Sequence, residues 1–146
     1  MQFGFGSSWV WGLGALVLVL CGIGAALFFR LVPVTEADVP QIDAQTATGD
    51  LELSGGHYAV RSLEAVSLFD LERQIVQTVR TRRISGSSDN LPMVFVHRSK
   101  IWGFPDVTQV WVENGHVHVY SHLVFGNSDL GVNRARMDIW LSAFDV

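Results

Sequence analysis

One long uncharged apolar run constrains this chain more than any other feature. The run extends from Trp9 to Phe29 and ends at Arg30. A helix of its 21 residues is about 31 Å long, close to the ~30 Å hydrocarbon core of a bilayer. Tryptophan at one end and arginine at the other are residue types that anchor helices at membrane interfaces. The pattern predicts a transmembrane helix over residues 9–32, after a short tail over residues 1–8.

Two kinds of cleaved leader are alternatives to a retained anchor. A secretory signal needs a basic amino-terminal region and a shorter apolar core, but residues 1–8 contain no Lys or Arg. A lipoprotein signal would use Cys21, yet the preceding Leu18-Val19-Leu20 lacks the small residue expected before a lipidated cysteine. The sequence therefore favours a retained anchor.

Small residues recur along one side of the expected helix. The pairs Gly14-Ala15, Cys21-Gly22 and Ala25-Ala26 recur at spacings of three, four and seven residues. The four that stand out in this stripe are Gly14, Gly22, Ala25 and Ala26. Such a stripe lets a second helix approach closely within lipid, although Gly is also common in membrane helices in general. We expect these four residues to contact a partner helix.

The 146 residues provide the anchor and one small domain. Residues 33–56 carry five acidic and no basic side chains, and we expect them to form an acidic extended linker. Residues 57–146 carry nine basic and nine acidic side chains. A neutral domain argues against nucleic acid as a partner. The single cysteine lies in the anchor, which excludes a disulfide framework and a cysteine-based metal site.

Residues 57–146 predict an α+β domain in the order strand, helix, three antiparallel strands, helix, with both helices on one sheet face. Ser67 has the position of a helix cap, and Asn114-Gly115 is a strong hairpin signal. We expect a loop where the chain is rich in Ser, Gly and Asp. The expected segments are strands at 57–62, 91–98, 107–113 and 116–125, helices at 67–83 and 128–143, and a loop at 84–90.

The hairpin around Asn114-Gly115 sorts its side chains into two different faces. A two-residue loop pairs residue 113 with 116 and 111 with 118, so one face collects valines, and we expect this face to pack under the helices. The opposite face is both polar and aromatic. Its residues Trp111, His118 and Tyr120 are the expected contact surface for a partner.

Three histidines on that polar face, His116, His118 and His122, raise the question of a metal site. Residues two apart on a strand project side chains about 7 Å apart, and a catalytic zinc site needs three converging ligands. A polar surface is the simpler interpretation. Neither a catalytic triad, a phosphate-binding glycine loop nor a dinucleotide motif is recognisable, so we expect no enzyme and no cofactor.

Two motifs carry a resemblance to a known family. The turn Gly103-Phe104-Pro105-Asp106 and the segment SDLGVNRAR over 128–136 are similar to those of the bacterial domain-of-unknown-function family fourteen-ninety-nine. The resemblance implies an anchor in the bacterial inner membrane, a periplasmic domain, and no assigned enzymatic activity. From the residues themselves, Asp129 suits a helix start and Gly131 a tight approach or a positive φ. We expect Arg134 and Arg136 to reach acidic partners such as Asp106.

Two functions are expected from these features. The first is a non-enzymatic accessory subunit of a larger integral-membrane complex, plausibly respiratory or photosynthetic, held in the lipid bilayer by one helix. The alternative is a periplasmic module that binds a small apolar ligand such as a lipid or quinone. The residues expected to line that ligand site are Trp102, Phe104, Trp140 and Phe144.

Overall fold

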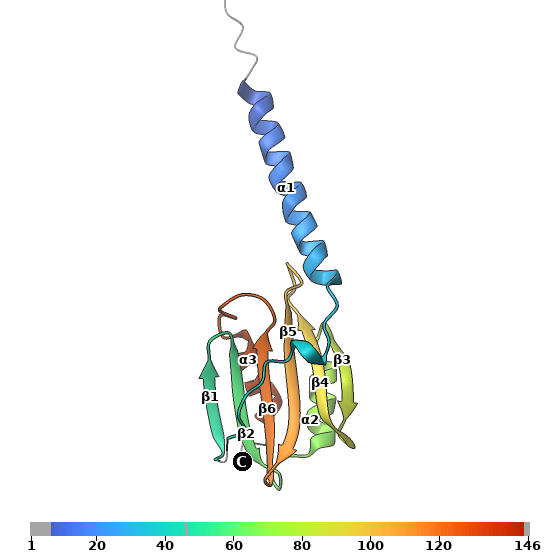
Figure 1. Cartoon of the computed structure of the whole chain (residues 1–146), viewed down its shortest axis with the longest axis vertical. Helices are drawn as coiled ribbons and strands as arrows, with labels where there is room; N and C mark the ends of the chain where they lie inside the picture. The colour runs from blue at the N-terminus through green and yellow to red at the C-terminus, as the bar shows by residue number, and fades with distance from the viewer. Residues whose placement is uncertain (1–6, 46, 145–146) are drawn as a thin grey trace, which may run out of the picture.

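The computed structural model describes residues 7–45 and 47–144, which form a long helix standing on one end of a sheet-and-helix domain (Figure 1). The expected tail 1–8 lies outside these residues except for its last two. The elements are α1 (Ser7–Leu31), η1 (Glu36–Asp38), β1 (Gly49–Leu53), β2 (Gly56–Ser62), α2 (Leu68–Gln77), β3 (Thr81–Ser87), β4 (Asn90–Arg98), β5 (Pro105–Glu113), β6 (His116–Leu123) and α3 (Val132–Leu141).

Helix α1 projects away from the domain (Figure 1). From Trp9 onward its side chains are largely exposed. Its segment Trp9–Leu31 has 23 residues and contains an 18-residue window with a mean hydropathy of 2.4. By length and composition, α1 is able to cross a membrane.

The domain is built on one antiparallel sheet in the order β1-β2-β6-β5-β4-β3. The expected register of the β5–β6 hairpin is confirmed: Glu113 pairs with His116 and Trp111 with His118. Asn114 and Gly115 both have positive φ, 50° and 76°, as a two-residue turn of this kind requires.

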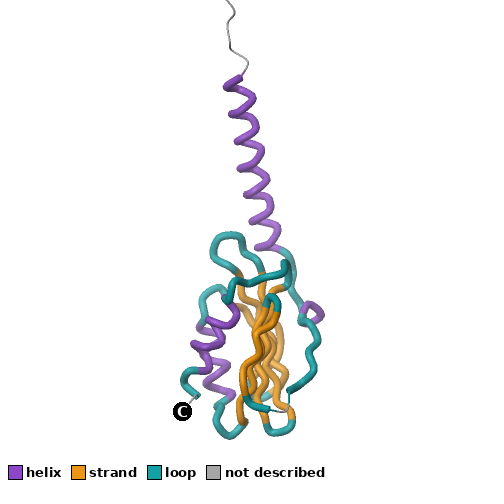
Figure 2. Tube along the Cα trace, turned by 90° about the vertical axis from the view of Figure 1, so that its left-hand side faces the viewer, coloured by secondary structure: helices purple, strands orange, loops and turns teal. Residues whose placement is uncertain are grey.

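Helices α2 and α3 cover one face of the sheet (Figure 2), as the sequence predicted for an α+β fold. The core lies between these helices and the valine face of the hairpin. Burial of this apolar surface provides the main driving force for folding of the domain. The fully buried side chains of this core include Leu71, Ile75, Phe95, Val110, Val117, Val119, Met137 and Trp140.

The structure contains two edge strands, β1 and β3, that the sequence did not predict, so the expected element order is corrected. Strand β1 lies within the stretch expected to be linker, and β3 overlaps the expected loop at 84–90. Both are polar; β1 is mostly exposed, and β3 is mostly half-buried. The register of β3 is irregular, and its Gly86 has a φ of 71°. Edge strands commonly carry charges and bulges and few apolar residues, so an apolar alternation does not reveal them.

The helix boundaries also differ from those expected. Ser67 caps α2 as predicted, and its Oγ accepts a hydrogen bond from the Asp70 amide. The helix ends at Gln77, however, six residues before the expected end at residue 83. Arg83 lies in β3 and forms an ion pair with Glu72. Helix α3 starts at Val132 rather than at residue 128, because the preceding residues form a turn.

The linker covers the opposite face of the sheet (Figure 2). Val34 and Val39 pack against β4 and β5, and Ile42 packs against aromatic residues of the central strands. Residues 33–45 therefore form a strap that packs on the sheet rather than a free tether, and the expected linker 33–56 is corrected accordingly.

Candidate functional site

An apolar groove of about 750 Å³ lies at the end of the domain where α1 is attached. Three segments distant in sequence form it: the last turn of α1, the turn between β4 and β5, and the chain between β6 and α3. Its lining residues are Phe29, Ser99, Lys100, Ile101, Trp102, Phe104, Asp106, Leu123, Phe125, Gly126, Ser128, Asp129, Leu130 and Val132. Pockets of this size accommodate small organic ligands.

Aromatic side chains join α1 to the rest of the groove. The Phe29 ring lies 4.3 Å from the Phe104 ring and 5.4 Å from the Phe125 ring, measured between centroids. At the groove rim, Ile101 is 71% exposed and Leu130 is 92% exposed. Leu130 also has a φ of 55°, an unfavourable conformation for a leucine. An apolar side chain held outward in such a conformation is a candidate for contact with a ligand or a membrane.

Two arginines attach the end of α1 to the β4–β5 turn. The guanidinium of Arg98 donates hydrogen bonds to the Phe29 carbonyl and, at 2.7 Å, to the Val32 carbonyl. Arg30 donates to the carbonyls of Lys100 and Ile101, at 2.9 and 2.7 Å. Carbonyls at a helix carboxyl end have no partner within the helix, and here Arg98 binds that of Phe29.

Gly103 permits this close approach of the turn to α1. Its φ is 76°, and a Cβ placed there would lie 2.2 Å from Cγ of Arg30. A side chain at this position would therefore strain the backbone and displace Arg30.

The two family-like motifs meet beside the groove through a buried ion pair. Arg136 on α3 donates to the Asp106 carboxylate on β5 at 3.1 Å, as the sequence suggested, and both side chains are almost buried. Burial raises the pKa of Asp106 above its usual value, against the opposing charge of Arg136. Arg136 also donates to the Asn133 Oδ1 atom at 2.8 Å. The pair joins the groove to the core.

A chain of buried polar groups continues from that ion pair under α3. Asn133 accepts from Ser121, whose hydroxyl lies 2.9 Å from that of Thr108, and Thr108 lies 2.9 Å from Nε2 of His97. Burial, and secondarily the charge of Arg136, lower the pKa of His97 to about 2. His97 is therefore neutral at ordinary pH, and hydrogen bonds link it through Thr108 and Ser121 to Asn133.

The turn before α3 is fixed by Asp129. Its carboxylate accepts hydrogen bonds from the backbone amides of Gly131, at 3.2 Å, and Asn133, at 2.8 Å. Burial alone would raise the pKa of Asp129, but these hydrogen bonds outweigh it and lower the pKa below its usual value. Gly131 has the expected positive φ, 76°, and Asp129 binds an amide at the start of α3, as expected of an acid at that place.

The structure separates the four residues expected to line a ligand site. Trp102 and Phe104 line the groove, whereas Trp140 is buried in the core, where its Nε1 donates to Thr78, and Phe144 packs against the same core. Sequence reasoning missed Arg98, because a charged residue at a strand end gives no periodic signal for contact with a distant helix.

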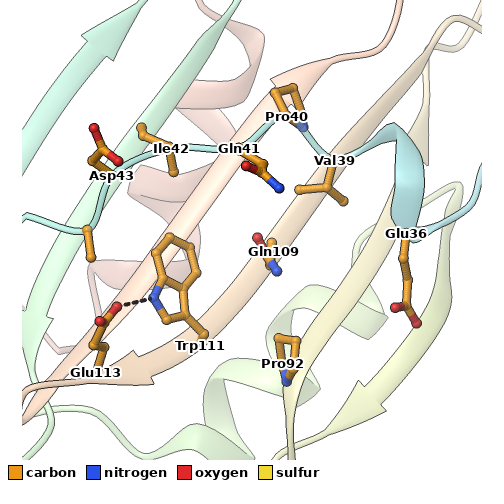
Figure 3. A pocket seen from close by; sticks show the side chains of 11 residues that line it. Glu36, Val39, Pro40, Gln41, Ile42, Asp43, Pro92, Gln109, Trp111 and Glu113 are labelled. Atoms are coloured by element: carbon orange, nitrogen blue, oxygen red, sulfur yellow. Dashed lines mark hydrogen bonds between the residues drawn. The ribbon is translucent and has the colours of Figure 1, made fainter.

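The expected contact surface on the sheet is largely covered. His118 and Tyr120 are buried, while Trp111 remains partly exposed. Figure 3 shows the Trp111 ring beside the strap, with its Nε1 donating to Glu113 at 3.3 Å. A second groove of about 690 Å³ runs between the strap and strands β4 and β5. Two of the three residues predicted to contact a partner, His118 and Tyr120, are therefore buried within the domain.

The histidines of this face are engaged separately in hydrogen bonds. His118 Nδ1 lies 2.6 Å from the Tyr58 hydroxyl, and its ring stacks on Trp111 with centroids 4.8 Å apart. His122 contacts the carbonyls of Leu123 and Ser54, and His116 contacts that of Asn114.

The small-residue stripe of α1 faces open space: a Cβ at Gly14 or Gly22 would meet no neighbouring atom of the described chain.

Comparison with known proteins gives one match. Searches of curated proteins and of solved structures found no match to this chain. The family described as "Protein of unknown function (DUF1499)" matches residues 37–144, from the strap to the end of the last core segment. The matched region includes the Asp106 turn and the segment around Arg136, and it leaves out α1. This chain belongs to the DUF1499 family.

Proposed function

We propose that this protein is a single-pass membrane protein of the bacterial inner membrane, whose periplasmic domain binds the apolar part of a membrane lipid or quinone in the groove at the end of α1. The observation that carries the proposal is the position of the groove. Its lining includes Phe29, in the last turn of the helix able to cross a membrane. A lipid chain would pass from the bilayer into the groove without crossing water.

The attachment of α1 supports a retained anchor over a cleaved leader. Arg98 and Arg30 make hydrogen bonds between α1 and the β4–β5 turn, and Phe29 packs on Phe104 and Phe125. Removal of α1 would leave the Arg98 guanidinium without these partners and would open one wall of the groove. A signal sequence has no such role in the mature protein.

The chemistry of the groove favours an amphiphile. Most of its lining is aromatic or aliphatic, while Lys100, Ser99 and Ser128 provide polar groups among the lining residues. An apolar chain would bury the exposed surfaces of Ile101 and Leu130, at about 25 cal/mol per Å². The polar head would remain near Lys100 and the water.

Lipid extraction and native mass spectrometry of the full-length protein, purified in a mild detergent, test the proposal. We expect one bound lipid or quinone per chain. Leu130→Ser should reduce its occupancy several-fold, because Leu130 lines the groove yet is 92% exposed and contributes little to the core. Ile139→Ser is the matched control, since Ile139 is also an exposed aliphatic residue of the α3 region but lies outside the groove. Equal occupancy in both variants would refute the site.

The accessory-subunit role is a second proposal, and one feature favours it. The open space beside Gly14 and Gly22 would let a partner helix approach α1 closely. Gly22→Leu should then weaken co-purification of an integral-membrane partner without unfolding the domain. A pull-down from gently solubilised membranes tests this, and unchanged recovery of every co-purifying protein would argue against the role.

A further inference from the structure

We propose that Asp50, His57 and Asp138 form a binding site for a divalent transition metal ion, for which we take Zn²⁺ as the probe. The site lies at the β1 edge of the domain, on the helix-covered face of the sheet. One ligand atom from each residue lies within 4.8 Å of the other two. Strand β1 supplies Asp50, β2 supplies His57, and α3 supplies Asp138.

The fold brings these residues together through strand pairing. Asp50 pairs with Ala59, which belongs to the core under the helices, and His57 lies two residues before Ala59 on the same face. Asp138 reaches the cluster from α3, which packs on β2. No motif marks the site in the sequence, because its ligands come from three separate elements and from an edge strand that the sequence did not predict.

His57 is the feature that points to a ligand. The residue is buried, with 3% of its surface exposed, and its Nδ1 has no hydrogen-bond partner among the described residues. A buried polar atom without a partner is unfavourable by about 1–3 kcal/mol. The same ring presents a nitrogen to two carboxylates within 4.8 Å. A bound cation would join all three groups, and the neutral imidazole is a common metal ligand.

Each of the two carboxylates has an arginine beside it, and a bound metal ion would share the carboxylates with these arginines. Arg61 donates a hydrogen bond to the Asp50 carboxylate at 2.7 Å. This guanidinium fixes the orientation of the carboxylate. Arg134 lies 3.9 Å from Asp138 and also contacts Glu52. The Asp138 side chain is 60% exposed and free to turn toward the ion.

The ligand set selects the class of metal. Three protein ligands, one of them an imidazole, equal in number those of zinc sites that keep a fourth position for water, and zinc accepts both nitrogen and carboxylate ligands. Calcium and magnesium prefer oxygen ligands throughout, and calcium takes six to eight of them. The three ligand atoms need to approach to within about 3.4 Å of one another around a tetrahedral ion. Rotation of the exposed Asp138 carboxylate provides part of that adjustment.

Zinc titration of the full-length protein in detergent, first dialysed against a chelator, tests the site. With a chromogenic zinc chelator as competitor, we expect one equivalent to bind, and we expect at least a tenfold loss of affinity in Asp138→Asn. That substitution changes an exposed side chain and leaves the core intact. His57→Gln should lose affinity as well, and circular dichroism of this variant checks that it folds.

Two control variants separate this site from adventitious zinc binding. Asp70→Asn removes an exposed carboxylate on α2, and His116→Gln removes a histidine of the strap-covered sheet face, so both should bind zinc as the parent does. Absence of a bound equivalent in the parent, or equal affinity in Asp138→Asn and Asp70→Asn, would overturn the proposal. Loss of binding in His116→Gln alone would also overturn it. None of these outcomes depends on lipid in the groove.

Discussion

Replacement of Arg136 by Met should destabilise the domain by an amount that depends on pH. Arg136 and Asp106 have side chains only 14% and 13% exposed and are 3.1 Å apart. Removal of one member of a buried ion pair costs about 3–5 kcal/mol, because the other charge remains buried without compensation. Methionine keeps most of the apolar volume, so the cost reports mainly on the lost charge and on the hydrogen bond to Asn133.

The sign of the pH dependence follows from Asp106. Burial already raises its pKa, and Arg136 opposes that effect, so loss of the arginine raises the pKa further. A carboxyl whose pKa is higher in the folded than in the unfolded state stabilises the fold below its ordinary pKa, and this contribution is lost as the pH rises through the folded value. The penalty of Arg136→Met should therefore be largest near neutral pH. At acid pH, where Asp106 is protonated, it should fall to about 1.5–3 kcal/mol, the value of hydrogen bonds from a charged donor.

Urea unfolding of the full-length protein in detergent, followed by circular dichroism from about pH 8 to about pH 4, measures this difference. The control is the same substitution in an Asp106→Asn background. There the penalty of Arg136→Met should be independent of pH, because the titrating carboxyl is absent. A penalty that stays constant with pH in the parent, or that varies equally in the Asp106→Asn background, would refute a buried charged pair.

Three further predictions concern other parts of the molecule. Arg98→Ala should free the end of α1 from the β4–β5 turn, and limited proteolysis between α1 and β1 should become faster while the urea midpoint changes little. Gly115→Ala should cost about 1–2 kcal/mol in urea unfolding, because alanine must adopt the left-handed φ of 76°. The His97 ring should show no titration by NMR between about pH 8 and about pH 5, since its pKa is about 2, and its presence should reduce stability as the pH falls below the ordinary value of 6.5.

The centre of the sheet was predictable from sequence, and its edges were not. In the β5–β6 hairpin, Asn114-Gly115 specifies the turn and alternating valines specify the buried face, so turn chemistry and pattern give the same register. Strand β1 contains Asp50 and Glu52, and β3 contains Arg82 and Arg83. Their pairing depends on backbone hydrogen bonds to a neighbouring strand, and the amino-acid composition does not reveal these bonds.

In the candidate site, the sequence predicted a contact between two residues only where both residues lie in recognisable motifs. Asp106 and Arg136 stood out as an acid in a turn and a base in a helix, and the structure brings them together. Arg98 had no such mark, because its partners are carbonyls of α1. Carbonyl groups are present at every residue, so no sequence pattern reports which of them a distant arginine will bind.

The use of the two sheet faces explains where functional surfaces remain. Helices α2 and α3 cover one face, and the strap over residues 33–45 covers much of the other, so that His118 and Tyr120 are buried. The ends and edges of the sheet are left uncovered by these elements. The apolar groove beside Phe29 lies at the end joined to α1, and the cluster around His57 lies at the β1 edge. The two sites share no residue, so a lipid in the groove and a cation at the edge can be tested separately in one protein.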